Sequence, residues 1–140
     1  MKIYLSNKKP ENSQYTHVSN VVSLDNMVLD SEATDVVVDN FLSQFSIDEL
    51  GVVLTKILSK LRLNATLTIK DKDVDVACMK YTRGDWSLRE VNSGLFNFGA
   101  IKSLINVDTI QANLPSGFHV DQASLDQQSG EFLIVARRSS

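Results

Sequence analysis

The sequence predicts one α/β domain over residues 1–140, built on a mostly parallel sheet that a C-terminal antiparallel hairpin closes. Three observations lead to this prediction. A strand, an amphipathic helix and a second strand follow one another between residues 35 and 70, in the order of a right-handed βαβ crossover. Two strand-like runs near the C-terminus are joined by a short polar turn. The 140 residues, 43% of them hydrophobic, suffice for one core without disulfides.

Strand-like runs begin at the N-terminus. Residues 2–6 and 15–19 have β-compatible composition, and residues 27–29 show a weaker pattern of the same kind. The strongest strand signal is the run at residues 35–39, in which two aspartates enclose three consecutive valines. Because this run does not alternate between apolar and polar residues, it predicts a strand buried on both faces of the sheet.

The helix of the crossover is the best-defined element. Ser46 and Glu49 have the S-x-x-E spacing of a capping box, so the helix is predicted to begin there. Apolar residues then recur at the spacing of one helical stripe: Leu50, Val53, Leu54, Ile57, Leu58 and Leu61. Asn64 tolerates a left-handed backbone and is predicted to end the helix, and residues 65–70 form the next strand.

Two further helical signals follow this strand. Residues 74–81 are predicted to form a helix with Asp73 as its N-terminal cap. Ser87 and Glu90 repeat the capping-box spacing and indicate a second helix start. Cys78 falls within the first of these helices and is predicted to be a small hydrophobic residue of the core.

The C-terminal hairpin is predicted from two runs, residues 118–125 and 131–137, which are rich in residues that favour strands. The connection between them, residues 126–130, is polar and ends in glycine, as hairpin turns often do. A hairpin pairs its strands antiparallel, so it would add an antiparallel edge to the otherwise parallel sheet.

Composition excludes several classes of function. The 14 Lys and Arg against 17 Asp and Glu give a net charge of −3, so nucleic acid is not expected as a partner. One cysteine and two histidines, His17 and His119, cannot form a four-ligand zinc site, and no metal is predicted. The longest apolar run, residues 132–136, is too short to cross a bilayer, and the N-terminus lacks a signal-peptide pattern. We therefore expect a cytoplasmic protein without a membrane partner.

The crossover and the hairpin also carry a family resemblance. Residues 34–45 form a strand that opens onto a loop, and an amphipathic helix follows. Residues 60–69 (KLRLNATLTI) then match a "kLkpGG-L-I" segment, while Leu42 and Phe45 match the apolar members of a "Leu-Glu-His-Phe" segment. Over most of its length the chain thus resembles the class I S-adenosylmethionine-dependent methyltransferases. The resemblance implies a Rossmann-like, methyltransferase-like fold with S-adenosylmethionine as the cofactor.

The resemblance also implies where the cofactor would bind. In short members of the family the first strand runs into a glycine-rich loop, and an acidic residue after the second strand holds the ribose hydroxyls. Residues 39–41 follow the strongest strand, and ligands of open α/β sheets bind at such strand ends. Asp25 is matched to the residue that contacts the adenine amine. The candidate cofactor-binding residues are Ser6, Asn7, Lys8, Ser19, Asp25, Asp39, Asn40 and Phe41.

Four positions depart from the pattern of the family. The first loop lacks glycine, because the first glycine of the chain is Gly51, and Ser19 stands at the acidic position. Residues 43–44 are Ser-Gln where the family has Glu-His, and residues 64–65 are Asn-Ala where it has two glycines. Together these departures predict a short, degenerate member that keeps the fold and has lost or changed its cofactor pocket.

Two functions therefore remain open. The chain is either a degenerate methyltransferase-like protein with weak or no catalysis, whose catalytic residues the sequence does not identify, or a non-enzymatic interaction or assembly module. Between Ser6 and Asp35 there are too few residues for the two helices that cover one face of the cofactor-binding half in the family. The sequence thus predicts a reduced set of helices, with part of the sheet bare or covered by a homodimer or a protein partner.

Overall fold

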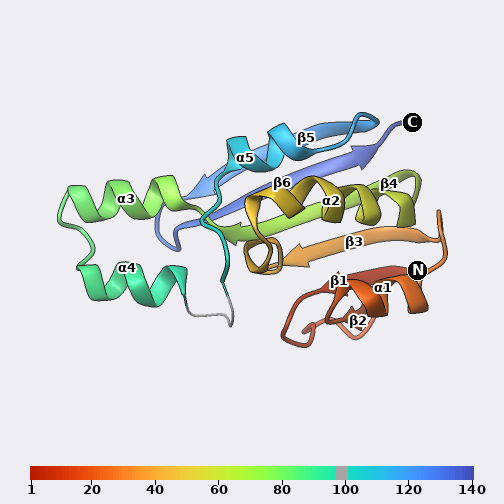
Figure 1. Cartoon of the computed structure of the whole chain (residues 1–140), viewed down its shortest axis with the longest axis horizontal. Helices are drawn as coiled ribbons and strands as arrows, with labels where there is room; N and C mark the ends of the chain where they lie inside the picture. Colours follow the sequence, from red (N-terminus) through yellow and green to blue (C-terminus); the bar gives the residue numbers. More distant parts are fainter. Residues whose placement is uncertain (97–100) are drawn as a thin grey trace.

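The computed structural model describes residues 1–96 and 101–140, which form one six-stranded sheet with helices packed on one face (Figure 1). The strands are β1 (Lys2–Leu5), β2 (Thr16–Val18), β3 (Ala33–Asp39), β4 (Leu61–Lys72), β5 (Phe118–Asp126) and β6 (Glu131–Arg138). The helices are α1 (Val21–Met27), α2 (Leu50–Lys60), α3 (Val74–Thr82), α4 (Leu88–Leu95) and α5 (Val107–Asn113), with the short 3-10 turns η1 (Leu42–Gln44) and η2 (Ile47–Glu49).

The strand order is β2-β1-β3-β4-β6-β5. Strands β1 to β4 pair in parallel, β6 pairs antiparallel with β4, and β5 pairs antiparallel with β6. This confirms the prediction of a mostly parallel α/β sheet closed by a C-terminal hairpin. The capping box of Ser46 and Glu49 is also present at the start of η2, which leads directly into α2.

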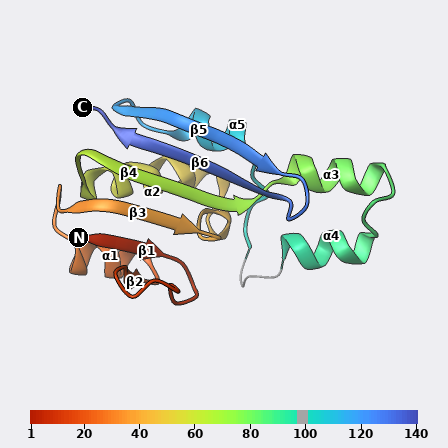
Figure 2. The same ribbon diagram turned by 180° about the vertical axis from the view of Figure 1, so that it is seen from behind.

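The two faces of the sheet have different surroundings. Helices α1, α2 and α5 contribute core residues and lie over one face, which we call the covered face (Figure 1). Its strand residues are Ile3, Leu5, Val36, Val38, Leu67, Ile69, Phe132, Ile134 and Ala136, all at most 1% exposed. No helix of residues 1–96 and 101–140 covers the opposite face, which Figure 2 shows from its own side. This open face carries Tyr4, Val37, Thr66, Thr68, Leu133 and Val135, all half-buried.

The strongest strand is buried on one face only. Val36 and Val38 are fully buried on the covered face. Val37 points the other way and is half-buried on the open face. The prediction of burial on both faces is therefore wrong for this chain, because no helix of the described residues packs over Val37.

Residues 27–29 do not form a strand, which corrects the prediction made from their composition. Helix α1 instead continues to Met27, because Asn20 caps its start and accepts a hydrogen bond from the Ser23 N–H at 2.7 Å. Val28, which is fully buried, begins the connection to β3. The apolar residues that suggested a strand thus lie at the end of a short helix and directly after it.

Helix α2 ends at Lys60 rather than at Asn64, so the predicted helix end is wrong. The backbone becomes extended at Leu61, which pairs with Ala33 of β3. Asn64 does adopt the left-handed conformation, with φ 65°, but within an irregular part of β4 where the pairing with β3 shifts.

Helices α3 and α4 form an arm that projects beyond the sheet (Figure 1). Its predicted caps are confirmed, since Asp73 accepts from the Val76 N–H at 3.0 Å and α4 begins with the capping box of Ser87 and Glu90. Cys78 is exposed, which corrects its assignment to the core, because it lies on the outward side of α3.

Candidate functional site

The carboxyl ends of β1, β2 and β3 meet at one edge of the sheet, where ligands bind in open α/β folds. The structure brings seven of the eight predicted residues to this edge and leaves Asp25 elsewhere. Ser6, Asn7, Lys8, Ser19, Asp39, Asn40 and Phe41 all lie at or directly after these strand ends.

Asp39 is the centre of a polar cluster at this edge. Its carboxylate accepts hydrogen bonds from the Tyr4 hydroxyl and from the Asn40 side-chain amide, the latter at 2.9 Å. The Lys8 ammonium lies 3.6 Å from the same carboxylate. Burial and the bond to Asp39 raise the pKa of the Tyr4 phenol well above its ordinary value, so Tyr4 remains a proton donor. The Asp39 carboxylate thus has partners on three sides.

Ser6 occupies the place where the family has the start of its glycine-rich loop. It is only 2% exposed, and its backbone N–H donates to the Val18 carbonyl at 3.2 Å. The Ser6 carbonyl lies 2.8 Å from Nε2 of His17, and its hydroxyl accepts from the Lys8 N–H at 3.3 Å. The N–H, the carbonyl and the hydroxyl of Ser6 therefore all hold the chain in place, and His17 has a structural role here.

The remaining candidates at the edge supply little for a cofactor. Ser19 is exposed, and its hydroxyl accepts from the Asn20 side chain at 3.4 Å. Asn7 is exposed and Phe41 is 1% exposed. The Phe41 ring meets the Phe45 ring edge-on, with centroids 5.2 Å apart, so Phe41 belongs to the core.

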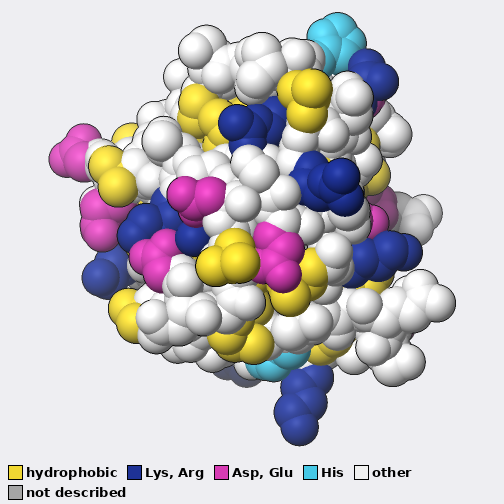
Figure 3. Space-filling view, turned by 90° about the vertical axis from the view of Figure 1, so that its right-hand side faces the viewer, with side chains coloured by type: hydrophobic (Ala, Val, Ile, Leu, Met, Phe, Trp, Pro, Cys, Tyr) yellow, Lys and Arg dark blue, Asp and Glu magenta, His cyan; other side chains and the backbone are white. Residues whose placement is uncertain are grey.

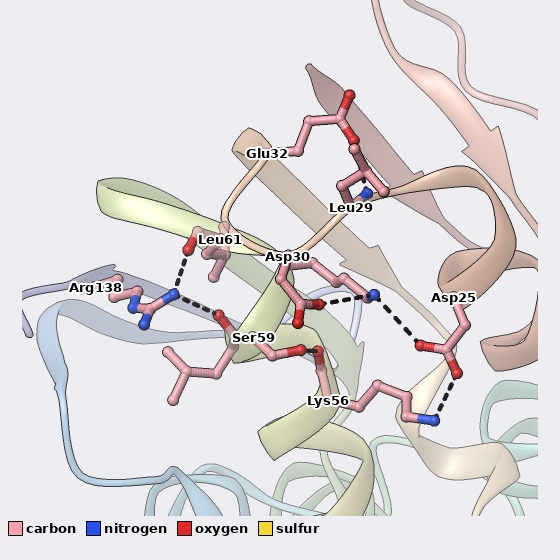
Figure 4. A network of polar contacts seen from close by, with 10 residues as sticks. Asp25, Leu29, Asp30, Glu32, Lys56, Ser59, Leu61 and Arg138 are labelled. Carbon is pink, nitrogen blue, oxygen red and sulfur yellow. Dashed lines mark hydrogen bonds and ion pairs between the residues drawn. The ribbon is translucent and has the colours of Figure 1, made fainter.

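Asp25 lies in a charged network at the other end of the sheet, where the parallel strands begin (Figure 4). Its carboxylate pairs with the ammonium of Lys56 at 2.6 Å and with that of Lys60 at 3.5 Å. The bond to Lys56 holds the pKa of Asp25 below its ordinary value. Lys60, which is 7% exposed, also binds Asp30 at 3.0 Å. Figure 3 shows charged side chains of both signs side by side on this end of the molecule.

The same network ties the C-terminus to helix α2 (Figure 4). The Arg138 guanidinium donates to the Leu58 carbonyl at 3.2 Å and to the Leu61 carbonyl. These carbonyls lie at the C-terminal end of α2 and at the first residue of β4, where the helix dipole favours a cation. Asp25 and its neighbours therefore stabilise the fold, and the structure does not bring Asp25 to the other candidates.

A pocket of about 450 Å³ adjoins the Asp39 cluster, between the loop after β1 and the open face. Besides Asp39 and Lys8, side chains that the sequence reasoning missed line it, among them Tyr4, Tyr15 and Lys70. The Tyr15 hydroxyl donates to Asp35 at 2.7 Å, and this bond, with burial, raises the pKa of Tyr15 to about 12. Successive side chains of a strand point to opposite faces of the sheet. The sequence of β1 therefore predicts that Tyr4 lies on the face opposite to that of the buried Ile3 and Leu5.

Asp71, near the end of β4, has a structural role. Asp71 is 1% exposed and accepts from the Lys72 N–H at 2.8 Å and from the Ser43 N–H and hydroxyl, both at 3.2 Å. Burial raises the pKa of Asp71 to about 6. The described residues contain no cluster of three or more potential metal ligands and no helix long and apolar enough to cross a bilayer.

The residues at this edge do not fit S-adenosylmethionine as the family binds it. The loop after β1 has a buried serine where a glycine would leave room for the cofactor. Ser19 offers a hydroxyl in place of the carboxylate for the ribose. Asp39 already has three partners, so a ligand would have to displace at least one of them.

Comparison with solved structures identifies the class of fold. The chain has the Rossmann-like fold of class I S-adenosylmethionine-dependent methyltransferases. It is similar to such a methyltransferase from Mesorhizobium loti, with a TM-score of 0.58, 14% identity and coverage of 93% of this chain and 72% of the other. For a methyltransferase from Methanosarcina mazei the TM-score is 0.57 at 14% identity, and the match covers 89% of this chain and 66% of the other. For one from Archaeoglobus fulgidus the TM-score is 0.57 at 10% identity, and the match covers 91% of this chain and 69% of the other.

Other neighbours are considerably longer than this chain. The chain covers 56% of a protein of echinomycin biosynthesis, with a TM-score of 0.55 and 12% identity. It covers 45% of a protein from Bordetella parapertussis, with a TM-score of 0.63 and 11% identity. No family model and no curated protein sequence matches the chain. At these identities the likeness concerns the fold.

Proposed function

We propose that this chain is a degenerate methyltransferase-like protein that binds S-adenosylmethionine weakly or not at all and has little or no methyl-transfer activity. The observation that carries the proposal is the closed polar cluster around Asp39, which takes up the strand end where the cofactor would need free partners. The glycine-free loop and the exposed Ser19 support the same conclusion.

Methyl-transfer activity depends on how tightly the cofactor is positioned. Methyl transfer from a sulfonium needs little acid–base chemistry, and most of its acceleration comes from holding the donor in line with the acceptor. A ligand that binds the Asp39 carboxylate would compete with the partners it already has, which are Lys8, Tyr4 and Asn40. Each partly buried bond adds to the cost of binding. Loss of tight positioning would therefore lower both affinity and turnover.

Calorimetric titration with S-adenosylmethionine and S-adenosylhomocysteine tests the proposal. We expect no saturable heat and no rise in melting temperature at millimolar ligand, because a ligand that binds only the folded state must stabilise it. A dissociation constant in the low micromolar range would contradict the proposal. In that case Lys8→Gln should change the affinity, whereas Lys80→Gln on the distant helix α3 should leave it unchanged.

A reconstruction variant sharpens this test. Ser19→Asp restores the acidic residue that the family uses for the ribose, and Asn7→Gly restores a glycine in the first loop. If these departures are the cause of lost binding, the double variant should gain measurable affinity for S-adenosylhomocysteine over the unmodified chain. If the double variant gains nothing, the cluster around Asp39 becomes the remaining explanation, and Lys8→Ala in the same background tests it.

The second candidate function is a non-enzymatic interaction or assembly module. It is favoured by the open face, because half of the sheet surface has no covering layer within the described residues. A radiolabel assay without methyl transfer, together with a stable complex formed through this face, would support the module.

A further inference from the structure

We propose that the open face is the interface of a symmetric homodimer in which the sheets of two copies pack face to face. This inference deepens the module function. It does not depend on whether the edge at Asp39 binds a cofactor.

One row of side chains across the open face is uncharged, although the exposed Lys70 lies two residues along β4 from Thr68 in this row, and the row continues to His17 on β2. Five adjacent strands each contribute one side chain to this row across the sheet. Each residue of the row is paired in register with the next one. The row consists of Tyr4, Val37, Thr68, Val135 and Gln122. Such a row can leave water without exposing an unpaired charge, as the centre of an interface requires.

Charges lie around this row, and several are already neutralised within the chain. The pairs are Lys72 with Glu131 at 3.2 Å, Arg137 with Asp121 at 3.5 Å, and Lys8 with Asp39 at 3.6 Å. The polar rim and neutral centre reproduce the usual anatomy of a protein interface. Positive and negative side chains both occur on the rim. Two copies of this face therefore do not meet with charges of one sign only.

The sequence of β3 supports a covering layer. Three consecutive valines are typical of a strand that is buried on both faces, yet Val37 is left half-buried in the single chain. Leu133 and Val135 of β6 share the open face with it. A second sheet about 10 Å away would bury these three side chains, as in β-sandwiches.

The size of the face suits a small dimer interface. Five strands about 4.8 Å apart, each presenting about three side chains roughly 6.8 Å apart, give a flat area of roughly 480 Å². This is about 60% of the roughly 800 Å² that each partner buries in a standard interface, so the proposed interface is a small one.

A second copy is the occupant that these features fit. Two-fold dimers use the same patch on both partners, so an uncharged row of side chains is self-complementary. Thr68 of β4 lies in the middle of the uncharged row, with β3 and β1 on one side and β6 and β5 on the other. A two-fold axis near the centre of the row would bring Thr68 close to Thr68 of the other copy.

Sedimentation velocity between about 1 and 200 μM tests the dimer. We expect the unmodified chain to have twice the chain mass at the upper end of this range. Thr68→Lys and Val135→Lys each place an ammonium in the centre and should give monomers with an unchanged circular dichroism spectrum. The control Val52→Lys, at a 71% exposed position on α2, should remain dimeric.

The outcomes separate cleanly. A monomer at 200 μM for the unmodified chain would overturn the proposal, and so would a dimer that survives both lysine substitutions in folded protein. A chain that stays monomeric but binds a different protein through this face would also overturn it, in favour of a heterologous partner. None of these results depends on cofactor calorimetry, so failure of the dimer and failure of the proposed function are distinguishable.

Disulfide trapping provides the second readout. In a Cys78→Ser background, which removes the only cysteine, Thr68→Cys should give a covalent dimer under mild oxidation. Val52→Cys in the same background should give none. Equal crosslinking of the two variants would mean that the copies meet at random, which contradicts the proposed interface.

Discussion

The covered and open faces of the sheet are built by the same strands, yet they differ in almost every physical respect. The neighbouring residues Leu67 and Thr68 lie on opposite faces, and the first is fully buried while the second is half-buried. The covered face has a helical layer and the open face has none among the described residues. The comparison shows that a methyltransferase-like sheet can keep one core on its covered face without a helical layer of the described residues on the other.

The largest expected effect is on the covered face. Leu67→Ala removes a side chain with 0% exposure and should lower the free energy of unfolding by about 3–4 kcal/mol, because transfer and cavity costs add. Thr68→Ala on the open face should cost less than about 1 kcal/mol. Urea unfolding at a concentration below that of self-association measures both. Equal losses would contradict the contrast between the faces.

The second prediction concerns pH and Asp71, which lies on the covered side next to Phe132. Its pKa rises from 3.8 to about 6 on folding, so the folded state binds more protons between these values. The stability from the proton on Asp71 is fully present below about pH 3.8 and is lost as the pH rises through about 6. This shift corresponds to about 3 kcal/mol.

Asp71→Asn is the matched variant for this prediction. The amide cannot titrate, so the loss of stability between about pH 4 and 6 should shrink in the variant. Chemical unfolding at several pH values measures the difference between the two chains. If the two pH profiles run parallel, another group causes the slope. Asp75→Asn, at an exposed position on α3, should leave the profile almost unchanged.

Most elements from β3 to β6 were predictable because their patterns are local, whereas α5 (Val107–Asn113) was not predicted. The capping box at Ser46, the apolar stripe of α2 and the polar turn before β6 each specify a structure within a few residues. The end of α2 was not predictable, because Leu61 continues the apolar stripe of the helix but pairs with Ala33 in the sheet. Tertiary pairing decided that boundary.

The candidate site was predictable in part for the same reason. Residues directly after strands, such as Lys8 and Asp39, are placed by the sheet edge itself. The position of Asp25 depends on where α1 packs. In the short segment between β1 and β3, α1 places Asp25 next to Lys56 on α2. Tyr4 and Lys8 approach Asp39 from a distant part of the chain, so this contact could not be seen in any local pattern.

The third prediction compares one substitution at two adjacent positions of β3. Val36→Ala should cost about 2 kcal/mol, because it removes two buried methyl groups from the covered face. Val37→Ala should cost less than about 1 kcal/mol in dilute protein. At high concentration its cost should grow, because the proposed dimer buries Val37. A cost for Val37→Ala that is independent of concentration would argue against that burial.

The smallest effect is expected for a polar bond on the open face. Tyr15→Phe removes the hydroxyl that donates to Asp35 at 2.7 Å and should cost about 0.5–1 kcal/mol, because water can replace the lost donor at this half-buried site. Tyr81→Phe, at a 52% exposed position on α3, is the control and should cost almost nothing. Spectrophotometric titration adds a direct readout, since the pKa of Tyr15 near 12 should fall towards 10 in Asp35→Asn. A loss well above 2 kcal/mol for Tyr15→Phe would mean that polar bonds organise the open face as strongly as apolar packing organises the covered one.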